Sequence, residues 1–414
     1  MKILLINKFH YKRGGSETYY FAQADAFRKK GHEVIFFAMK DEQNIYCEQE
    51  EYFVPNVDYN KSGINGKISA ARNLFYSPVA AEKMEELIKK EKPDIAHIGL
   101  LHRQITFSVV EVLKKYNIPI VMTMHDLIFA CPNYTMLVND EICENCIEGS
   151  VIDCIKKKCV KDSFSKSILG AMEKKYLLSK NYYDMIDLYI TECNFYRELM
   201  LRSKVTKSPI ITMSNFLPIE QKYEFNEGYK EYILYFGRFS REKGIKTLLE
   251  AHKKSDCKYP LVLVGAGPVQ SEIEKYIESN KLSNVKLPGA IYGDEMEKII
   301  EEAKVIITPS EWYENCPYAL LQSIAKGKIV VASNIGGLPE LIKDGETGFL
   351  FEPGNVDDLL SSIEKVMQME KEEYVSMSRK ICEKAKEKHY WETYIDKLIH
   401  EYETLLEQKT KNVL

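Results

Sequence analysis

The feature that most constrains the fold is a regular alternation between short apolar runs and longer amphipathic segments. Near the start of the chain, the runs Lys2–Asn7 and Glu33–Ala38 flank an amphipathic segment, Ser16–Lys30. Continuously apolar runs indicate strands buried on both faces, and strands that alternate with helices build parallel sheets. The pattern therefore predicts an α/β fold, with Gly31 suited to a left-handed cap that ends the first helix.

Further strands are expected in both halves of the chain: Asp94–Gly99, Ile118–His125, Leu188–Thr191, Ile210–Ser214, Tyr232–Phe236, Leu261–Gly265, Val285–Leu287, Val305–Pro309 and Ile329–Ser333. Because 414 residues exceed what one core usually supports, we expect two doubly wound, Rossmann-like domains. The polar segment Pro218–Lys230 suggests the boundary, which gives domains at residues 1–217 and 218–389 and a C-terminal helix at 390–414.

In such sheets, ligands bind at the carboxyl ends of the strands, so the strand-to-helix loops are where function is expected. The first such loop contains Gly14 and Gly15. Paired glycines let backbone N–H groups approach a phosphate at a helix N-terminus, although they also occur in plain tight turns. In the second half, Arg238 and Lys243 follow a strand, and they could clamp a diphosphate or simply carry surface charge around a turn.

The richest segment runs from Pro309 to Gln322. Pro317 suits the first turn of a helix, so the residues around it would present free backbone N–H groups; these are Asn315, Cys316 and Tyr318. A carboxylate at Glu314 can accept hydrogen bonds from sugar hydroxyls, and an amide at Gln322 can bond to ribose hydroxyls. The alternative is a carboxylate that only stabilises the helix.

Four segments together resemble the retaining glycosyltransferases of family 4, which have the GT-B fold. They are the Gly14-Gly15 loop, Gly237–Gly244, Glu314–Gln322 and Gly336–Gly348, in that order along most of the chain. The resemblance implies two Rossmann-like domains facing across a cleft, with the C-terminal helix packing on the first domain. It also implies a nucleotide-diphosphate sugar as donor, retention at the anomeric carbon, and no catalytic metal or other cofactor.

The resemblance assigns roles to the loop residues. Arg238 and Lys243 would bind the donor pyrophosphate, and Gly14 and Gly15 would help to hold its phosphate. Glu314 corresponds to the first of two family glutamates, the one near the donor sugar.

Gln322 stands where the family has its second glutamate, near the nucleotide ribose. Gln keeps an acceptor oxygen but lacks the charge, which puts normal nucleotide affinity in doubt. His125 follows an expected strand, where it could be a packed histidine oriented by Asp126, but the family has a histidine there that contacts the donor sugar. Backbone near Ile291 would contact the nucleotide base.

Half of the ten cysteines fall within residues 131–159: Cys131, Cys143, Cys146, Cys154 and Cys159. The spacing of Cys143 and Cys146 is that of a zinc knuckle, and a structural zinc site of Cys131, Cys143, Cys146 and Cys159 is one choice among several. Reduced, buried thiols are the alternative.

The net charge of −4 and the pI near 6.2 give no electrostatic reason to expect nucleic-acid binding. Eight lysines nevertheless gather between Cys154 and Lys180: Lys156, Lys157, Lys158, Lys161, Lys166, Lys174, Lys175 and Lys180. They suit either a solvated helix face or contact with anionic lipid at the inner membrane face. The apolar run at the N-terminus is too short for a signal peptide, so a cytoplasmic protein is expected.

These observations favour a glycosyltransferase that moves a sugar to a hydroxyl of a glycan or lipid-linked oligosaccharide, in surface polysaccharide biosynthesis. A nucleotide-sugar epimerase of similar fold and a non-catalytic nucleotide-binding homologue are the alternatives.

Overall fold

The computed structural model describes residues 1–56 and 74–413. The chain divides into two compact units. Unit 1 contains Met1–Ile219 and Trp391–Leu414, and unit 2 contains Glu220–Tyr390.

Unit 1 is built on a six-stranded sheet of order β2-β1-β3-β4-β7-β8. Every neighbouring pair is parallel, and β1 and β2 are buried almost throughout. This arrangement confirms the expectation from their continuous apolar runs. The strands are β1 Lys2–Ile6, β2 Glu33–Phe37, β3 Ile95–Ile98, β4 Ile120–Met124, β7 Leu188–Thr191 and β8 Ile210–Thr212.

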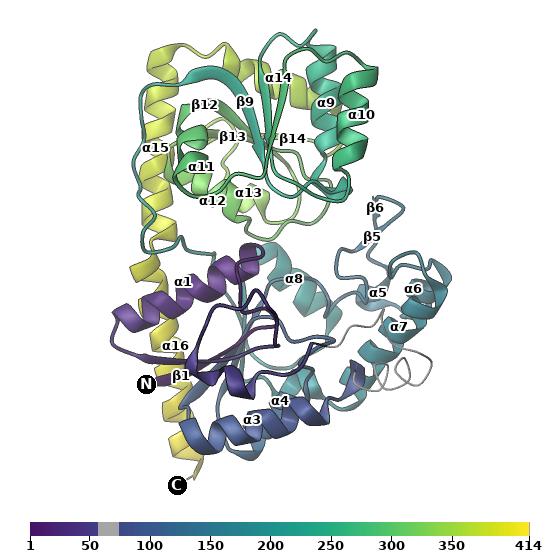
Figure 1. Cartoon of the computed structure of the whole chain (residues 1–414), viewed down its shortest axis with the longest axis vertical. Helices are drawn as coiled ribbons and strands as arrows, with labels where there is room; N and C mark the ends of the chain where they lie inside the picture. Colours follow the sequence, from purple (N-terminus) through teal and green to yellow (C-terminus); the bar gives the residue numbers. More distant parts are fainter. Residues whose placement is uncertain (57–73, 414) are drawn as a thin grey trace. The chain divides into compact units, whose positions relative to one another are not determined.

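Helices flank this sheet, and α3 and α4 lie side by side (Figure 1). Gly31, with φ +83°, follows the end of α1 as expected. Ser77 caps α3 by accepting a hydrogen bond from Ala80 N, with Pro78 as the first helical residue. The helices are α1 Gly15–Lys29, α3 Pro78–Glu91, α4 Ser108–Lys115, α7 Phe164–Ser179 and α8 Asn194–Ser203, with 3₁₀ turns at Glu48–Tyr52 and Tyr182–Met185.

The last helix, α16 (Trp391–Val413), packs on unit 1 beside α1. The hydroxyl of Tyr394 is 2.8 Å from that of Tyr19, and the hydroxyl of Tyr402 hydrogen-bonds to His97 Nδ1. Lys30, the residue after α1, forms an ion pair of 2.9 Å with Glu392. These contacts confirm that the C-terminal helix belongs with the first domain.

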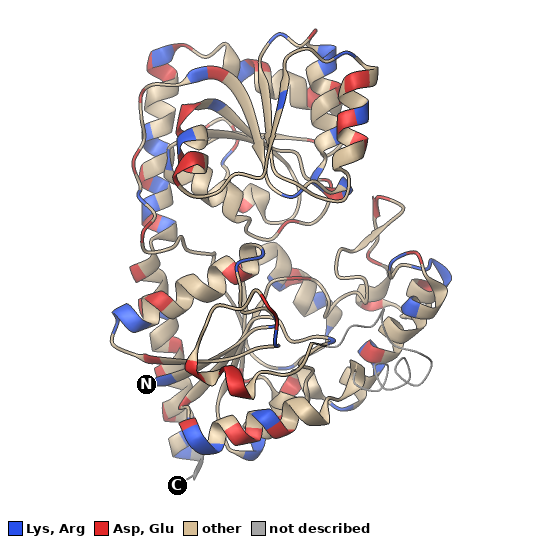
Figure 2. Ribbon diagram, viewed as in Figure 1, with Lys and Arg blue, Asp and Glu red and all other residues tan. Residues whose placement is uncertain are grey.

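Unit 2 repeats the architecture with a parallel six-stranded sheet of order β11-β10-β9-β12-β13-β14. Its strands are β9 Lys230–Phe236, β10 Leu261–Val264, β11 Val285–Gly289, β12 Ala303–Thr308, β13 Ile329–Ser333 and β14 Phe349–Phe351. The helices are α9 Ile245–Lys254, α10 Gln270–Ser279, α11 Gly293–Glu302, α12 Tyr318–Ala325, α13 Leu338–Leu341, α14 Val356–Met367 and α15 Lys371–His389. Figure 2 shows basic and acidic positions interleaved along α15.

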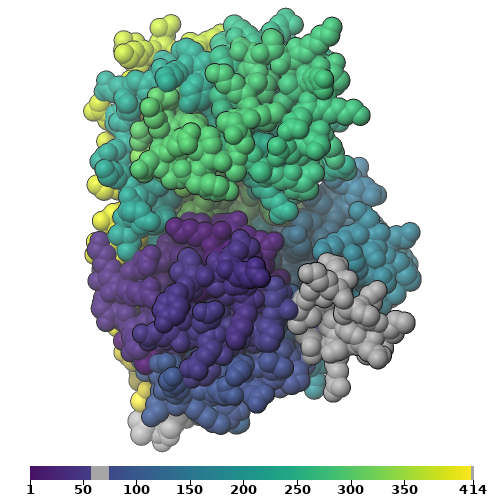
Figure 3. All heavy atoms as spheres, in the orientation of Figure 1, coloured from purple at the N-terminus to yellow at the C-terminus, as the bar shows by residue number. Residues whose placement is uncertain are grey.

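The cysteine-rich segment forms an insert on the side of unit 1 (Figure 3). It contains a short antiparallel pair, β5 Leu137–Val138 and β6 Glu141–Ile142, and two short helices, α5 Asn145–Glu148 and α6 Ile152–Lys156. Lys174 of α7 is buried and donates hydrogen bonds of 2.5 Å to Ala130 O and 3.0 Å to Cys146 O. It therefore braces the insert from inside and does not belong to a lysine-rich surface.

Among the described residues, no helix is long and apolar enough to cross a membrane.

Candidate functional site

In unit 2, the loops after β9 and β12 bring a lysine and a buried glutamate into contact. Lys243 lies in the 3₁₀ turn Arg241–Lys243, and its Nζ is 2.6 Å from Glu314 Oε1. Ser310 Oγ donates to the same oxygen at 2.6 Å. The Glu314 side chain is 5% exposed and that of Lys243 is 23% exposed, so the ion pair is closed on the carboxylate side and open to solvent at the lysine.

The charge of Glu314 is stabilised by these partners. Burial on its own raises the pKa of the carboxyl, but the Lys243 ammonium and the hydrogen bonds from Lys243 and Ser310 outweigh burial, so the pKa lies below its ordinary value. Glu314 is therefore ionised at neutral pH and can only accept hydrogen bonds. A group of this kind suits the hydroxyls of a sugar.

Two glycines hold the Glu314 loop in place by close backbone contact. Gly244 has φ +66°, and a Cβ there would lie 1.8 Å from Pro309 O. Gly336 has φ +59°, and a Cβ there would lie 2.4 Å from Glu314 O, which also accepts a hydrogen bond of 2.8 Å from Gly337 N. No side chain fits at either position without moving the backbone that carries Glu314.

The helix after this loop, α12, begins at Tyr318. Pro317 precedes it with φ −70° and ψ 131°, so the expectation that Pro317 lies in the first turn is wrong by one residue. Its carbonyl still accepts the first hydrogen bonds of the helix, from Leu320 N and Leu321 N at 3.1 and 3.2 Å. Asn315, Cys316 and Tyr318 are buried around this start.

The remaining expected donor residues of unit 2 lie on nearby elements without bonding to Glu314. Arg238 is exposed just beyond β9. Ile291 is half-buried in the loop between β11 and α11. Gln322 is half-buried in α12, and its amide makes no hydrogen bond with the part of the chain that the structure describes.

In unit 1, His125 follows β4 and pairs with Glu192, the first residue after β7. His125 Nδ1 is 2.7 Å from Glu192 Oε1, and the two side chains are 7% and 5% exposed. Burial alone lowers the pKa of His125. The charge and hydrogen bond of Glu192 raise this pKa by more than burial lowers it, so the pKa lies above its ordinary value. Sequence reasoning missed Glu192, although it directly follows the expected strand Leu188–Thr191.

The paired glycines lie where α1 begins: Gly14 precedes the helix and Gly15 is its first residue. Gly14 has φ −166°, an extended conformation open to any residue, and a Cβ there would make only an ordinary 3.7 Å contact with Glu17. The fold therefore gives no steric reason for glycine at position 14.

The cysteines of the insert do not assemble the expected zinc site. Cys131 interacts with Cys146, and Cys154 with Cys159, while Cys143 lies 3.4 Å from Lys157 Nζ. Within residues 1–56 and 74–413, no group of three or more histidine, cysteine or acidic side chains could hold a metal ion. The described side chains therefore do not form the four-thiolate site expected of Cys131, Cys143, Cys146 and Cys159, and none of the ten cysteines, all within the described ranges, forms a disulfide.

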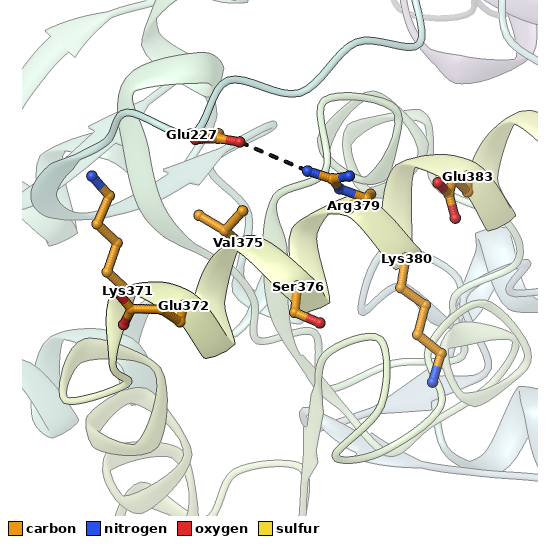
Figure 4. Close-up of a pocket in the computed structure, with 8 residues that line it drawn as sticks. All are labelled: Glu227, Lys371, Glu372, Val375, Ser376, Arg379, Lys380 and Glu383. Carbon is orange, nitrogen blue, oxygen red and sulfur yellow. Dashed lines mark ion pairs between the residues drawn. The ribbon is translucent and has the colours of Figure 1, made fainter.

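An open groove of about 600 Å³ lies elsewhere in unit 2, between α15 and the segment that carries Glu227 (Figure 4). The side chains along it are mostly charged, and Arg379 pairs with Glu227 at 3.8 Å. None of the residues expected to bind the donor lines this groove, so its size does not make it the candidate site.

Two family models match consecutive parts of the chain. The model described as Glycosyltransferase Family 4 matches residues 13–221, just over half of the chain, and the model described as Glycosyl transferases group 1 matches residues 218–388. The second match contains both Lys243 and Glu314.

Curated relatives agree with these matches. An uncharacterized glycosyltransferase of Methanocaldococcus jannaschii is 30% identical over 37% of this chain and 42% of its own length. The N-acetyl-alpha-D-glucosaminyl L-malate synthase of Bacillus anthracis is 23% identical over 91% of this chain and 89% of its own. The chain spans less than two thirds of some relatives, namely 42% of the archaeal protein and 57% of the sulfoquinovosyl transferase of Arabidopsis thaliana.

Solved structures share the fold over almost the whole chain. Sucrose-phosphate synthase from Thermosynechococcus elongatus aligns with a TM-score of 0.70 at 18% identity, covering 98% of this chain and 99% of its own. Anabaena Alr3699/HepE, solved in complex with UDP-glucose, aligns with a TM-score of 0.66 at 15% identity, covering 98% and 100%. Together with the two parallel sheets, these alignments establish the GT-B fold, and the family matches show that the chain belongs to glycosyltransferase family 4.

Proposed function

We propose that the protein transfers a sugar from a nucleoside-diphosphate donor to a hydroxyl of a glycan or lipid-linked acceptor, with retention at the anomeric carbon. The observation that carries this proposal is the Lys243–Glu314 pair, a buried carboxylate and a partly exposed cation on adjacent strand-to-helix loops of unit 2.

Each group of the pair has a complementary task. The Glu314 carboxylate accepts hydrogen bonds from sugar hydroxyls. The Lys243 ammonium, which is partly exposed, can bind a phosphate oxygen while it remains close to Glu314. Arg238, exposed at the end of β9, adds a planar cation for the same diphosphate. Gly14 in unit 1 supports phosphate access, because its fold position does not demand glycine.

The reaction breaks the bond between the anomeric carbon and the diphosphate oxygen and forms a bond from the acceptor oxygen to that carbon. The acceptor proton passes to the departing diphosphate. Negative charge grows on the leaving group, so fixed cations at Arg238 and Lys243 stabilise the transition state more than the bound donor. In this scheme His125, which pairs with Glu192, contacts the donor sugar near the reacting carbon.

Relatives guide the choice of donor and acceptor to test. UDP and UDP-glucose are the ligands of the Anabaena structures, so UDP-sugars come first. Surface polysaccharide assembly at the inner face of the membrane is the proposed setting, supported by an O-antigen chain mannosyltransferase of Escherichia coli that is 25% identical over 69% of this chain.

The test incubates the protein with UDP-, GDP- and ADP-sugars, with and without membrane extract as the source of acceptor. Sugar transfer and free nucleotide are measured by mass spectrometry and chromatography, and the anomeric configuration by proton NMR. Glu314→Gln is expected to lower transfer by roughly ten- to a hundredfold, the loss of a charged hydrogen bond worth about 1.5–3 kcal/mol. Glu311→Gln is the matched control, because Glu311 lies in the same loop but bonds to Thr247.

The outcomes separate the alternatives. Product that forms only with acceptor supports transfer. Conversion of the donor with no acceptor present indicates an epimerase, and nucleotide binding without turnover indicates a non-catalytic homologue. Equal loss in Glu311→Gln and Glu314→Gln would remove the special role of Glu314.

A further inference from the structure

Three cations gather at the carboxyl edge of the unit 1 sheet, outside the donor residues discussed above. Lys8 lies two residues beyond β1, Arg13 lies later in the same loop, and Arg103 follows β3. Lys8 Nζ and the Arg13 guanidinium both contact the ring of Phe9, at 5.2 and 4.1 Å from its centroid. Parallel sheets bind ligands at this edge, and the strand order reverses here between β1 and β3.

Lys8 is half-buried, and its ammonium makes no ion pair or hydrogen bond with the described parts of the chain; only its backbone carbonyl accepts a hydrogen bond, from Met39 N. Burial lowers the pKa of its ammonium to about 8, and repulsion from Arg103 and Arg13 adds to this, ahead of the attraction from Asp126 and Glu173. A lysine whose charged form is destabilised by burial and by neighbouring cations, at the ligand-binding edge of a sheet, is typical of a functional position.

The nearby carboxylates are already engaged. Glu173 accepts a hydrogen bond of 3.2 Å from Arg103 Nε, and Asp126 accepts one of 3.1 Å from Ile128 N. Burial raises the pKa of both carboxyls, so neither supplies Lys8 with a fully compensating charge.

A second unsatisfied group lies in the same place. His102 Nε2 is buried with no hydrogen-bond partner among the described residues. Burial, together with Arg103 and Lys8, lowers the pKa of His102 to about 3, so the ring is neutral and can carry its proton on Nε2 as a donor. A buried donor of this kind destabilises the fold unless a ligand or water accepts its hydrogen bond.

The site adjoins the histidine expected at the reacting centre. Asp126 follows His125 directly, and a Cβ at Gly99 would lie 3.5 Å from His125 Nε2. A group held by Lys8 and Arg103 would therefore be bound at the sheet edge of unit 1 that carries His125, whereas Arg238 and Lys243, the cations assigned to the donor diphosphate, belong to unit 2.

We infer that Lys8, Arg13, Arg103 and His102 Nε2 form an anion site for a carboxylate or phosphate group of the acceptor. This inference rests on the proposed function, since it assigns the anion to an acceptor. It narrows the acceptor class to molecules that carry a negative group close to the hydroxyl that receives the sugar.

The test titrates inorganic phosphate and, separately, malonate into the intact protein by calorimetry, with UDP as a third ligand. Lys8→Met is expected to lower the affinity for whichever anion binds more tightly by about tenfold, the effect of losing one charge-assisted hydrogen bond. It should leave the affinity for UDP unchanged. Lys8→Arg should restore most of the anion affinity. Lys12→Met is the matched control, because Lys12 is exposed in the same loop, and it should bind both anions normally.

Acylation of Lys8 in the unmodified protein, followed by mass spectrometry, provides a second measurement that does not depend on a variant folding. Phosphate or malonate should protect Lys8 and leave Lys12 reactive. Equal anion affinity in Lys8→Met and wild type, or no protection of Lys8, overturns the site. If Lys8→Met lowered the affinity for UDP as much as the affinity for the anion, the site would bind the donor diphosphate, and the acceptor assignment would be overturned.

Failure of the proposed function would appear differently, as an absence of sugar transfer by a protein that still binds phosphate or malonate through Lys8.

Discussion

Lys328 is a buried lysine whose ammonium has no hydrogen-bond partner among the described residues, and it offers a quantitative test of how charge affects the stability of unit 2. It immediately precedes β13, is 1% exposed, and its Nζ has no hydrogen-bond partner among the described residues. Burial lowers its pKa from 10.5 to about 8, with only a distant opposing effect of Glu301. This difference corresponds to about 3 kcal/mol that the charged form costs the folded state, at about 1.36 kcal/mol for each pKa unit.

The sign follows from where the proton binds. Below pH 8 the lysine is charged in both the folded and the unfolded chain, so the full cost acts at pH 7. Between pH 8 and 10.5 the folded chain has released the proton while the unfolded chain still binds it, so stability rises with pH. Lys328→Met removes the cost, and we expect a gain of up to about 3 kcal/mol at pH 7 that shrinks by roughly 2 kcal/mol at pH 9.5.

The assay is urea unfolding followed by circular dichroism at pH 7 and 9.5, read as the difference between variant and wild type so that other titrating groups cancel. Lys326→Met is the matched control. Lys326 is 6% exposed but forms ion pairs of 3.0 and 2.7 Å with Glu297 and Glu301, so its loss should destabilise unit 2. The reasoning is refuted if Lys328→Met is less stable than wild type at pH 7, or if its advantage is the same at both pH values.

Two further predictions concern the site. Gln322→Glu should lower the dissociation constant of UDP by roughly 2- to 30-fold, since a charged acceptor gains about 0.5–2 kcal/mol over a neutral one; calorimetry with 2′,3′-dideoxy-UDP should show no such gain, and an equal gain would mean that the side chain does not face the ribose. Glu192→Gln should lower the pKa of His125, because the Glu192 charge and hydrogen bond raise it; NMR titration of the His125 ring checks this, and an unchanged midpoint would show that Glu192 does not control the charge of His125.

Much of the fold could be predicted because the central strands, such as β3, β4 and β13, are buried at every residue and are therefore largely apolar along their length. Ile329–Ser333, for example, is buried at every residue. The strand Phe349–Phe351 was missed because it has only three residues and follows a glycine-rich turn. Lys174 was wrongly grouped with surface lysines, since nothing in its neighbours along the chain reveals that its ammonium reaches the carbonyls of Ala130 and Cys146.

The site was predictable in its parts but not in its pairings. Lys243 and Glu314 each stand after an expected strand, yet their contact joins residues far apart in sequence and depends on Gly244 and Gly336 packing against the loop backbone. Glu192 has no motif of its own; only the adjacent positions of β4 and β7 in the sheet bring it to His125. Such contacts follow from topology, and a single sequence shows only their separate ends.

The place of α16 also has a consequence for biosynthesis on the ribosome. The nascent chain makes β1 to β8 first, but the helix that completes unit 1 emerges only after all of Glu220–Tyr390, a delay of roughly 10–35 s at about 5–20 residues per second. In that interval Phe27 lacks Tyr402, 5.6 Å away in the finished protein, and Phe216 lacks its stacking partner Tyr394. During that interval these aromatic side chains lack the contacts that α16 supplies. Any split or chimaeric version should therefore carry residues 391–413 together with the first unit.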